Sequence, residues 1–191
     1  MNSEEKYYDH YKDTWSLQQS YLSERNKLTA SLLILLVLVA GFMYEPANFP
    51  EKVNTYLDSR VKGLSFDMKY LNTGFIFLLL WVMTRYYQAV IKIERMYHYL
   101  KDCETTLSAD KKYIINREGV YYSKSKAWLI SVLNFCYVVL LPVAIIIIAI
   151  IKIINECKCG WTKNFKVADF IGLGLIILLS LLYILNRWFK K

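Results

Sequence analysis

Cationic side chains interleaved with tyrosines mark the segment from Arg85 to Lys126. It holds nine of the 24 lysines and arginines of the chain. Cations neutralise phosphate groups and tyrosine rings stack on bases, so this composition suits the binding of nucleotides or single-stranded nucleic acid. It suits a membrane interface equally well, and the sequence alone favours that interpretation. If the segment binds an anionic ligand, the candidate ligand-binding residues are Arg85, Lys92, Arg95, Lys101, Lys111, Lys112 and Arg117.

Motifs for catalysis and for metal binding are missing from the sequence. It has two histidines, His10 and His98, and no HExxH, GxSxG or P-loop motif. Cys157 and Cys159 could cross-link subunits, but two thiolates without a nearby histidine make a poor metal site. We therefore expect no enzyme, no metal site and no cofactor.

The elements that must position these residues are membrane helices. Hydrophobic residues make up 55% of the chain. A helix needs roughly 20 mostly apolar residues to cross a bilayer. We expect crossings at residues 28–44, 70–84, 127–154 and 167–191, the last of which ends in a basic tail. The predicted fold class is all-α, an integral membrane four-helix bundle with N-terminal and central cytoplasmic helical extensions.

The distribution of lysine and arginine predicts the orientation of these crossings. Basic residues are concentrated in residues 1–27, in residues 85–126 and in the C-terminal tail. They are fewer in the stretches 45–69 and 152–166, which contain the two predicted loops at residues 45–69 and 155–166. By the positive-inside rule both termini and the central segment are cytoplasmic, and the two loops are outside. The net charge of +8 therefore points to the inner leaflet or to an anionic cytoplasmic ligand.

Both cytoplasmic segments have the pattern of an amphipathic helix. In the first part of residues 85–126, which we call the stalk, apolar residues recur at steps of three and four if Glu104 is allowed in the series. The stalk face comprises Tyr86, Val90, Ile93, Tyr97, Leu100 and Leu107. The matching N-terminal face comprises Tyr8, Tyr11, Trp15, Gln18 and Leu22. We expect the two faces to pack together, since the near-neutral charge of residues 1–27 argues against an anionic-lipid anchor.

Polar residues inside the predicted crossings are few and mild. No acidic or basic residue lies at the centre of a crossing, which argues against a proton relay or a voltage sensor. Asn72 and Thr73 lie at the start of the second crossing, and Asn134 and Tyr137 share a face of the third. The latter pair could line a narrow pore if several subunits assemble around an axis, but hydrogen bonding between helices is the favoured interpretation.

Proline and glycine predict local features of the third and fourth crossings. Pro142 removes one backbone hydrogen bond, and a neighbouring helix is expected to satisfy the freed carbonyl. Gly172 and Gly174 would allow a neighbouring helix to approach closely, although they do not match the GxxxG spacing.

The stalk sequence Gln88–Leu100 (QAVIKIERMYHYL), followed by Asn116–Gly119 before the third crossing, resembles small bacterial four-helix membrane effectors of antiphage defence. Among these, the chain resembles the ion-channel effectors of Hailong systems. The resemblance covers the second crossing, residues 85–126 and the start of the third crossing. It transfers no binding residue, and the cations named above are chosen on their chemistry alone.

The resemblance implies a function and partners. It implies a homo-oligomer, a tetramer in that family, which forms an ion channel in the bacterial inner membrane and depolarises an infected cell. The expected ligand is a nucleotide or a short single-stranded DNA, made by a partner nucleotidyltransferase and bound from the cytoplasm. The alternatives are a non-conducting scaffold that recruits a protein through Tyr97 and Leu100 of the stalk, and an effector that disrupts the bilayer without a defined pore.

Overall fold

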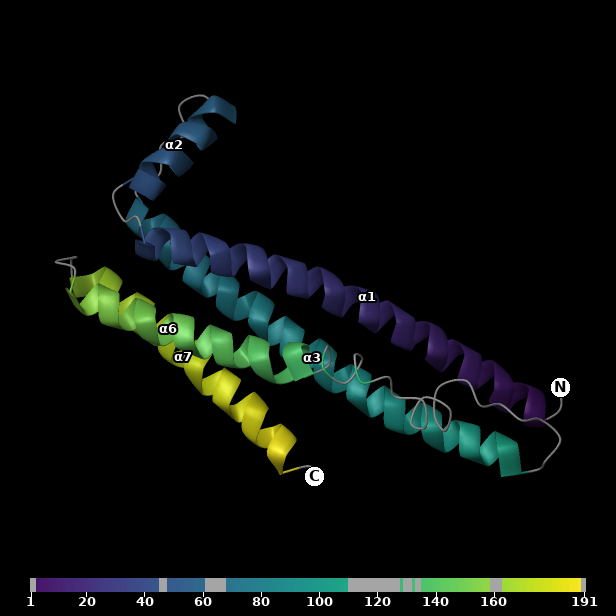
Figure 1. Cartoon of the computed structure of the whole chain (residues 1–191). Coiled ribbons are helices and arrows are strands. Elements are labelled where there is room, and N and C mark those ends of the chain that lie inside the picture. Colours follow the sequence, from purple (N-terminus) through teal and green to yellow (C-terminus); the bar gives the residue numbers. More distant parts are fainter. Residues whose placement is uncertain are drawn as a thin grey trace. The chain divides into compact units, whose positions relative to one another are not determined.

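The computed structural model describes residues 3–44, 48–60, 68–109, 128, 132, 135–158 and 163–189. Almost all of these residues are helical, and none of them forms a strand. Figure 1 shows the helices in chain order. They are α1 (Ser3–Tyr44), α2 (Asn48–Arg60), α3 (Met68–Ala109), the π-helical turn η1 (Cys136–Leu140), α6 (Leu141–Lys158) and α7 (Lys163–Trp188).

Four of the described helices are long and apolar enough to cross a membrane. The corresponding segments are Tyr8–Met43, Tyr70–Thr106, Cys136–Cys157 and Val167–Trp188. In each of them, less than half of the most apolar window is buried within the chain. Apolar side chains that face outward in this number are typical of helices surrounded by lipid or by other membrane helices. The all-α fold class is thus confirmed for the described residues, and the four long apolar helices suggest a multi-pass membrane protein.

The chain divides into two compact units, and the boundaries fall within α1, within α3 and at η1. Unit 1 consists of Met1–Leu28 and Tyr86–Val138, and unit 2 consists of Thr29–Arg85 and Val139–Lys191. The helix α2 belongs to unit 2 and lies in a region that the sequence pattern predicted only as a loop.

Unit 1 is built on the pairing of α1 with α3. Tyr11 Oη donates a hydrogen bond to Glu104 Oε1 at 3.0 Å, and His10 Nε2 lies 2.7 Å from Tyr99 Oη. Further along, Lys92 lies over the ring of Tyr21, so the two helices run antiparallel. On the predicted stalk face, the described side chains that are buried are Tyr86, Val90, Ile93, Leu100 and Glu104.

The burial of Leu100 argues against one of the sequence-based alternatives. Leu100 is fully buried and packs with Tyr11 and Cys103, while Trp15 lies against this cluster. Its side chain therefore stabilises the α1–α3 pair and is not available to a protein partner. A scaffold that recruits a partner through Leu100 would first have to separate these helices.

In unit 2, α6 and α7 lie side by side and α3 packs against α7 (Figure 1). A Cβ atom added to Gly172 would lie 2.8 Å from Ile76 Cγ2, so glycine permits a close approach of α7 to α3. Ser180 Oγ donates to Met83 Sδ at 3.5 Å further along the same pair of helices. A Cβ atom added to Gly174 would meet nothing within 4 Å, so the predicted close approach holds for Gly172 only.

Candidate functional site

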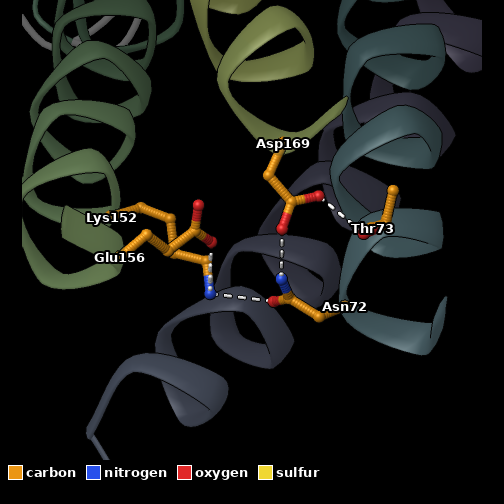
Figure 2. Close-up of polar contacts among 5 residues, drawn as sticks. All are labelled: Asn72, Thr73, Lys152, Glu156 and Asp169. Atoms are coloured by element: carbon orange, nitrogen blue, oxygen red, sulfur yellow. Dashed lines mark hydrogen bonds and ion pairs between the residues drawn. The ribbon is translucent and has the colours of Figure 1, made fainter. Parts of the chain in front are cut away.

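Five polar side chains from three helices of unit 2 form a connected cluster, which we call the charged cluster (Figure 2). Its residues are Asn72 and Thr73 on α3, Lys152 and Glu156 on α6, and Asp169 on α7. All of them lie within the segments that are long and apolar enough to cross a membrane. Ionisable groups in such segments are costly to bury, so they mark functional sites by default.

Asn72 is the bridge of the charged cluster. Lys152 Nζ donates to Asn72 Oδ1 at 2.8 Å, and Asn72 Nδ2 donates to Asp169 Oδ2 at 3.1 Å. Thr73 Oγ1 donates to the other carboxylate oxygen of Asp169, Oδ1, at 2.6 Å. The ammonium of Lys152 also lies 3.3 Å from Glu156 Oε1. One amide on α3 therefore joins the cation of α6 to the carboxylate of α7.

Burial makes these contacts energetically important. Asp169 is 0% exposed, Asn72 1%, Lys152 4% and Glu156 7%. A buried charge is tolerated when it is paired and hydrogen-bonded, and Lys152 meets both conditions. Asp169 accepts two hydrogen bonds from the neutral side chains of Asn72 and Thr73. Glu156 meets these conditions less well, because neither of its oxygens has a hydrogen bond to a described residue and only Oε1 makes the ion pair.

Chain topology explains why these residues converge. Asn72 and Thr73 lie in the second turn of α3, which begins at Met68, and Lys152 and Glu156 lie in the last two turns of α6, which ends at Lys158. Residues four apart share a helix face, so Lys152 and Glu156 point the same way. If α3, α6 and α7 each cross the membrane, the start of α3, the end of α6 and the start of α7 lie at the same membrane side.

The sequence patterns do not single out this site. They count Lys152 with a loop, class Asn72 and Thr73 as mild polar residues and give Asp169 no distinction. A signal is nevertheless present, because Lys152 and Glu156 are four residues apart at the end of an apolar run and an aspartate opens the next one. Nothing in one sequence, however, specifies that these side chains face the same neighbour.

The predicted ligand-binding cations occupy exposed positions where they are described. Arg85, Lys92, Arg95 and Lys101 lie on α3 with exposed side chains, Arg85 in unit 2 and the other three in unit 1. The remaining three predicted cations, Lys111, Lys112 and Arg117, lie outside the described residues.

Two cations of unit 1 lie over tyrosine rings. Lys92 Nζ lies 5.3 Å from the ring centroid of Tyr21, and Arg25 Cζ lies 5.3 Å from that of Tyr137. Tyr21 and Arg25 are four residues apart on α1 and so share a face. Arg25 is not among the predicted ligand-binding residues, because it lies outside the central segment. These cation–π contacts place positive charge and aromatic surface together in unit 1.

The predicted pore or packing residues surround the π-helical turn. Asn134 lies outside the described residues, whereas Tyr137 is part of η1 and Pro142 is buried in α6. In a π-helical turn a carbonyl pairs with the N–H five residues on, and for Tyr137 that residue is Pro142, which has no N–H. Tyr86 Oη donates to the Tyr137 carbonyl at 2.7 Å. A side chain of α3 thus hydrogen-bonds the backbone of the turn that precedes Pro142.

Similarity to known proteins gives no further guide to the site. No protein-family model, curated protein or solved structure matches the chain. Among the described residues, no group of three or more histidine, cysteine or acidic side chains could hold a metal ion. The chemistry of the charged cluster therefore rests on its own geometry.

Proposed function

We propose that this chain forms a homo-oligomeric ion channel in the bacterial inner membrane, with both termini in the cytoplasm. The observation that carries the proposal is the charged cluster, which buries two carboxylates and one ammonium inside segments suited to cross a bilayer. Ionisable groups within membrane-spanning segments are rare and are associated with ion or substrate pathways.

The composition of the cluster favours an ion pathway over a purely structural role. A structural clamp between helices needs only neutral hydrogen bonds, and apolar residues would replace a buried ion pair with little loss of stability. Two carboxylates beside one ammonium also leave a net negative charge when all three groups are ionised. A clamp gains nothing from that excess charge, whereas carboxylates that line a pathway attract cations.

Assembly of several copies provides the pathway in this proposal. The four candidate crossings leave most of their apolar windows unburied within one chain. Neighbouring subunits would cover part of this apolar surface, and lipid would cover the rest. The resemblance to antiphage effectors suggests a tetramer, in which the charged clusters of the subunits surround a common axis.

Control from the cytoplasm rests on unit 1 and on the resemblance. The exposed cations Lys92, Arg95 and Lys101 lie on α3, and a polyanion would be attracted to them. The ligand in this proposal is an anionic nucleotide or a short single-stranded DNA from a partner nucleotidyltransferase. It gates the channel by binding the open and closed states with different affinity. The biological outcome is depolarisation of a phage-infected cell.

Electrophysiology on the reconstituted full chain tests the proposal. We expect single-channel current steps in planar bilayers, and a change in open probability when a short deoxyadenosine oligomer is added on one side. Lys92→Ala with Arg95→Ala should weaken the response to the oligomer without removing the steps. Lys12→Ala, which removes an exposed cation from α1, is the matched control. Absence of current steps with and without oligomer would refute the channel.

A further inference from the structure

We propose that Glu156 and Asp169 bind a monovalent cation in transit through the channel, and that Lys152 is a tethered competitor for the same position. The inference rests on the proposed channel function for its role in conduction. The cation site itself rests on the geometry of the charged cluster.

The carboxylate of Glu156 has capacity to bind a cation that its described contacts do not use. Its side chain is 7% exposed, and neither carboxylate oxygen makes a hydrogen bond to a described residue. In Figure 2 the carboxylate extends from α6 on the side of Asn72 and Asp169. A buried carboxylate retains several lone pairs that need donors or a cation. A cation beside Glu156 would contact Oε2, which accepts no hydrogen bond from a described residue and is not the oxygen that pairs with Lys152.

The net charge of the cluster favours a monovalent cation. With Lys152, Glu156 and Asp169 ionised, the cluster carries one net negative charge, which a single monovalent cation neutralises. A divalent ion would leave the buried site with a net positive charge, which is unfavourable away from water. Oxygen ligands from Glu156, Asp169, Asn72 and Thr73 are of the hard type that alkali cations bind.

The ammonium of Lys152 occupies the position that we propose for the cation. Its ammonium lies 2.8 Å from Asn72 Oδ1 and 3.3 Å from Glu156 Oε1. Lysine carries this charge on a flexible stem of four carbons, so the ammonium can leave its partners without movement of the helix. An arriving cation exchanges with the ammonium, which keeps the occupied site from becoming a permanent trap. Channels require this balance between binding and release.

Binding is tested separately from conduction. The full chain in detergent is unfolded by heat in KCl, in NaCl and in N-methyl-D-glucamine chloride at equal ionic strength. We expect K⁺ or Na⁺ to raise the unfolding temperature of the wild type, because a ligand that binds only the folded state stabilises it. Glu156→Gln should abolish that rise, and Glu51→Gln, the same change at an exposed position of α2, should retain it. No rise in the wild type would overturn the cation site.

A second variant keeps the test decisive if Glu156→Gln does not fold. Lys152→Met removes the competing ammonium and leaves two carboxylates for the cation. Because a like charge a few ångströms away is strongly unfavourable in a protein interior, we expect the K⁺ affinity to rise by more than about tenfold. An unchanged or weaker K⁺ affinity in this variant would contradict the role of Lys152 as competitor.

Conduction then shows whether the site selects ions. With a KCl gradient across the bilayer, the wild type should show a reversal potential close to that of a cation-selective pore. Glu156→Gln should move the reversal potential toward zero, and Glu51→Gln should not. If the protein conducts and Glu156→Gln leaves the reversal potential unchanged, the inference fails and the channel stands. If cations bind and no current flows, the channel proposal fails and the binding site stands.

Discussion

In both units, basic side chains contact other side chains, but the interactions differ. In unit 1, Lys92 and Arg25 lie over the tyrosine rings of Tyr21 and Tyr137. In unit 2, Lys152 is buried and its ammonium contacts oxygen atoms on two helices. A ring face attracts a cation without neutralising its charge, whereas a carboxylate neutralises it.

This contrast separates the chemistry that each unit supports. Lys92 lies beside an aromatic ring and is exposed, so its positive charge can attract an anion, which suits the nucleotide ligand proposed for unit 1. Excess carboxylate around a buried ammonium attracts a further cation, which suits the site proposed in unit 2. The groups that surround a basic residue therefore matter more to its role than its position in the chain.

Among the residues of the charged cluster, we expect Asn72 to contribute most to the stability of unit 2. Asn72→Leu deletes the acceptor of Lys152 and one donor of Asp169, and hydrogen bonds to charged groups contribute roughly 1.5–3 kcal/mol each. We expect the free energy of unfolding in detergent to fall by about 3 kcal/mol. Asn186→Leu, at an exposed position of α7, is the control and should change it little. Equal effects of the two substitutions would show that the charged cluster does not hold unit 2 together.

A smaller effect is expected from the apolar packing of the same unit. Gly172→Ala places a methyl group 2.8 Å from Ile76 Cγ2, which belongs to a stiff β-branched side chain. Overpacking of this kind costs roughly 1–3 kcal/mol, and we expect about 2 kcal/mol by the same unfolding measurement.

The matched control for Gly172 is Gly174→Ala, whose new methyl group meets nothing within 4 Å. It should be neutral or slightly stabilising, because alanine favours a helix over glycine by about 1 kcal/mol. If Gly174→Ala destabilises as much as Gly172→Ala, close packing of α3 against α7 is not the cause.

The smallest effect is expected at Tyr137 in the π-helical turn. Tyr86→Phe removes the hydroxyl donor of the Tyr137 carbonyl and should cost about 1 kcal/mol of unfolding free energy. Pro142→Ala returns a backbone N–H to the helix, so the cost of Tyr86→Phe should shrink in that background. A double-mutant cycle measures this coupling. If the costs of the two substitutions are additive, the proline is not the reason for the contact made by Tyr86. Tyr8→Phe, at an exposed position, is the control for the loss of a hydroxyl group.

Much of the fold follows from periodicity and composition, as particular residues show. The stalk pattern predicted that Tyr86, Val90 and Ile93 share a buried face, and all three are buried. It also placed Glu104 on that face, where the structure pairs it with Tyr11. Local helix geometry fixes which residues share a face, so one sequence is sufficient for such predictions.

The charged cluster could not be predicted from the spacing of residues within one helix. Lys152 is only 4% exposed and yet ends an apolar run, where a basic residue is normally taken as the start of a loop. Its partner Asn72 lies 80 positions away in the sequence. Pairing over that separation depends on how α3, α6 and α7 pack, and side-chain spacing within one helix carries no information about it.

Three features follow from the sequence: the helical character of the chain, its four segments able to cross a membrane and the buried face of the stalk. Tyr8, which was expected on the packing face of the N-terminal helix, is instead exposed. Hydrophobicity and the helical repeat are local properties, and they are sufficient to predict those three features. Only the folded chain reveals that Lys152, Glu156 and Asp169 meet around Asn72, and that Tyr86 serves the carbonyl of Tyr137. Those contacts join different helices, and the packing of one helix against another specifies which side chains come within bonding distance.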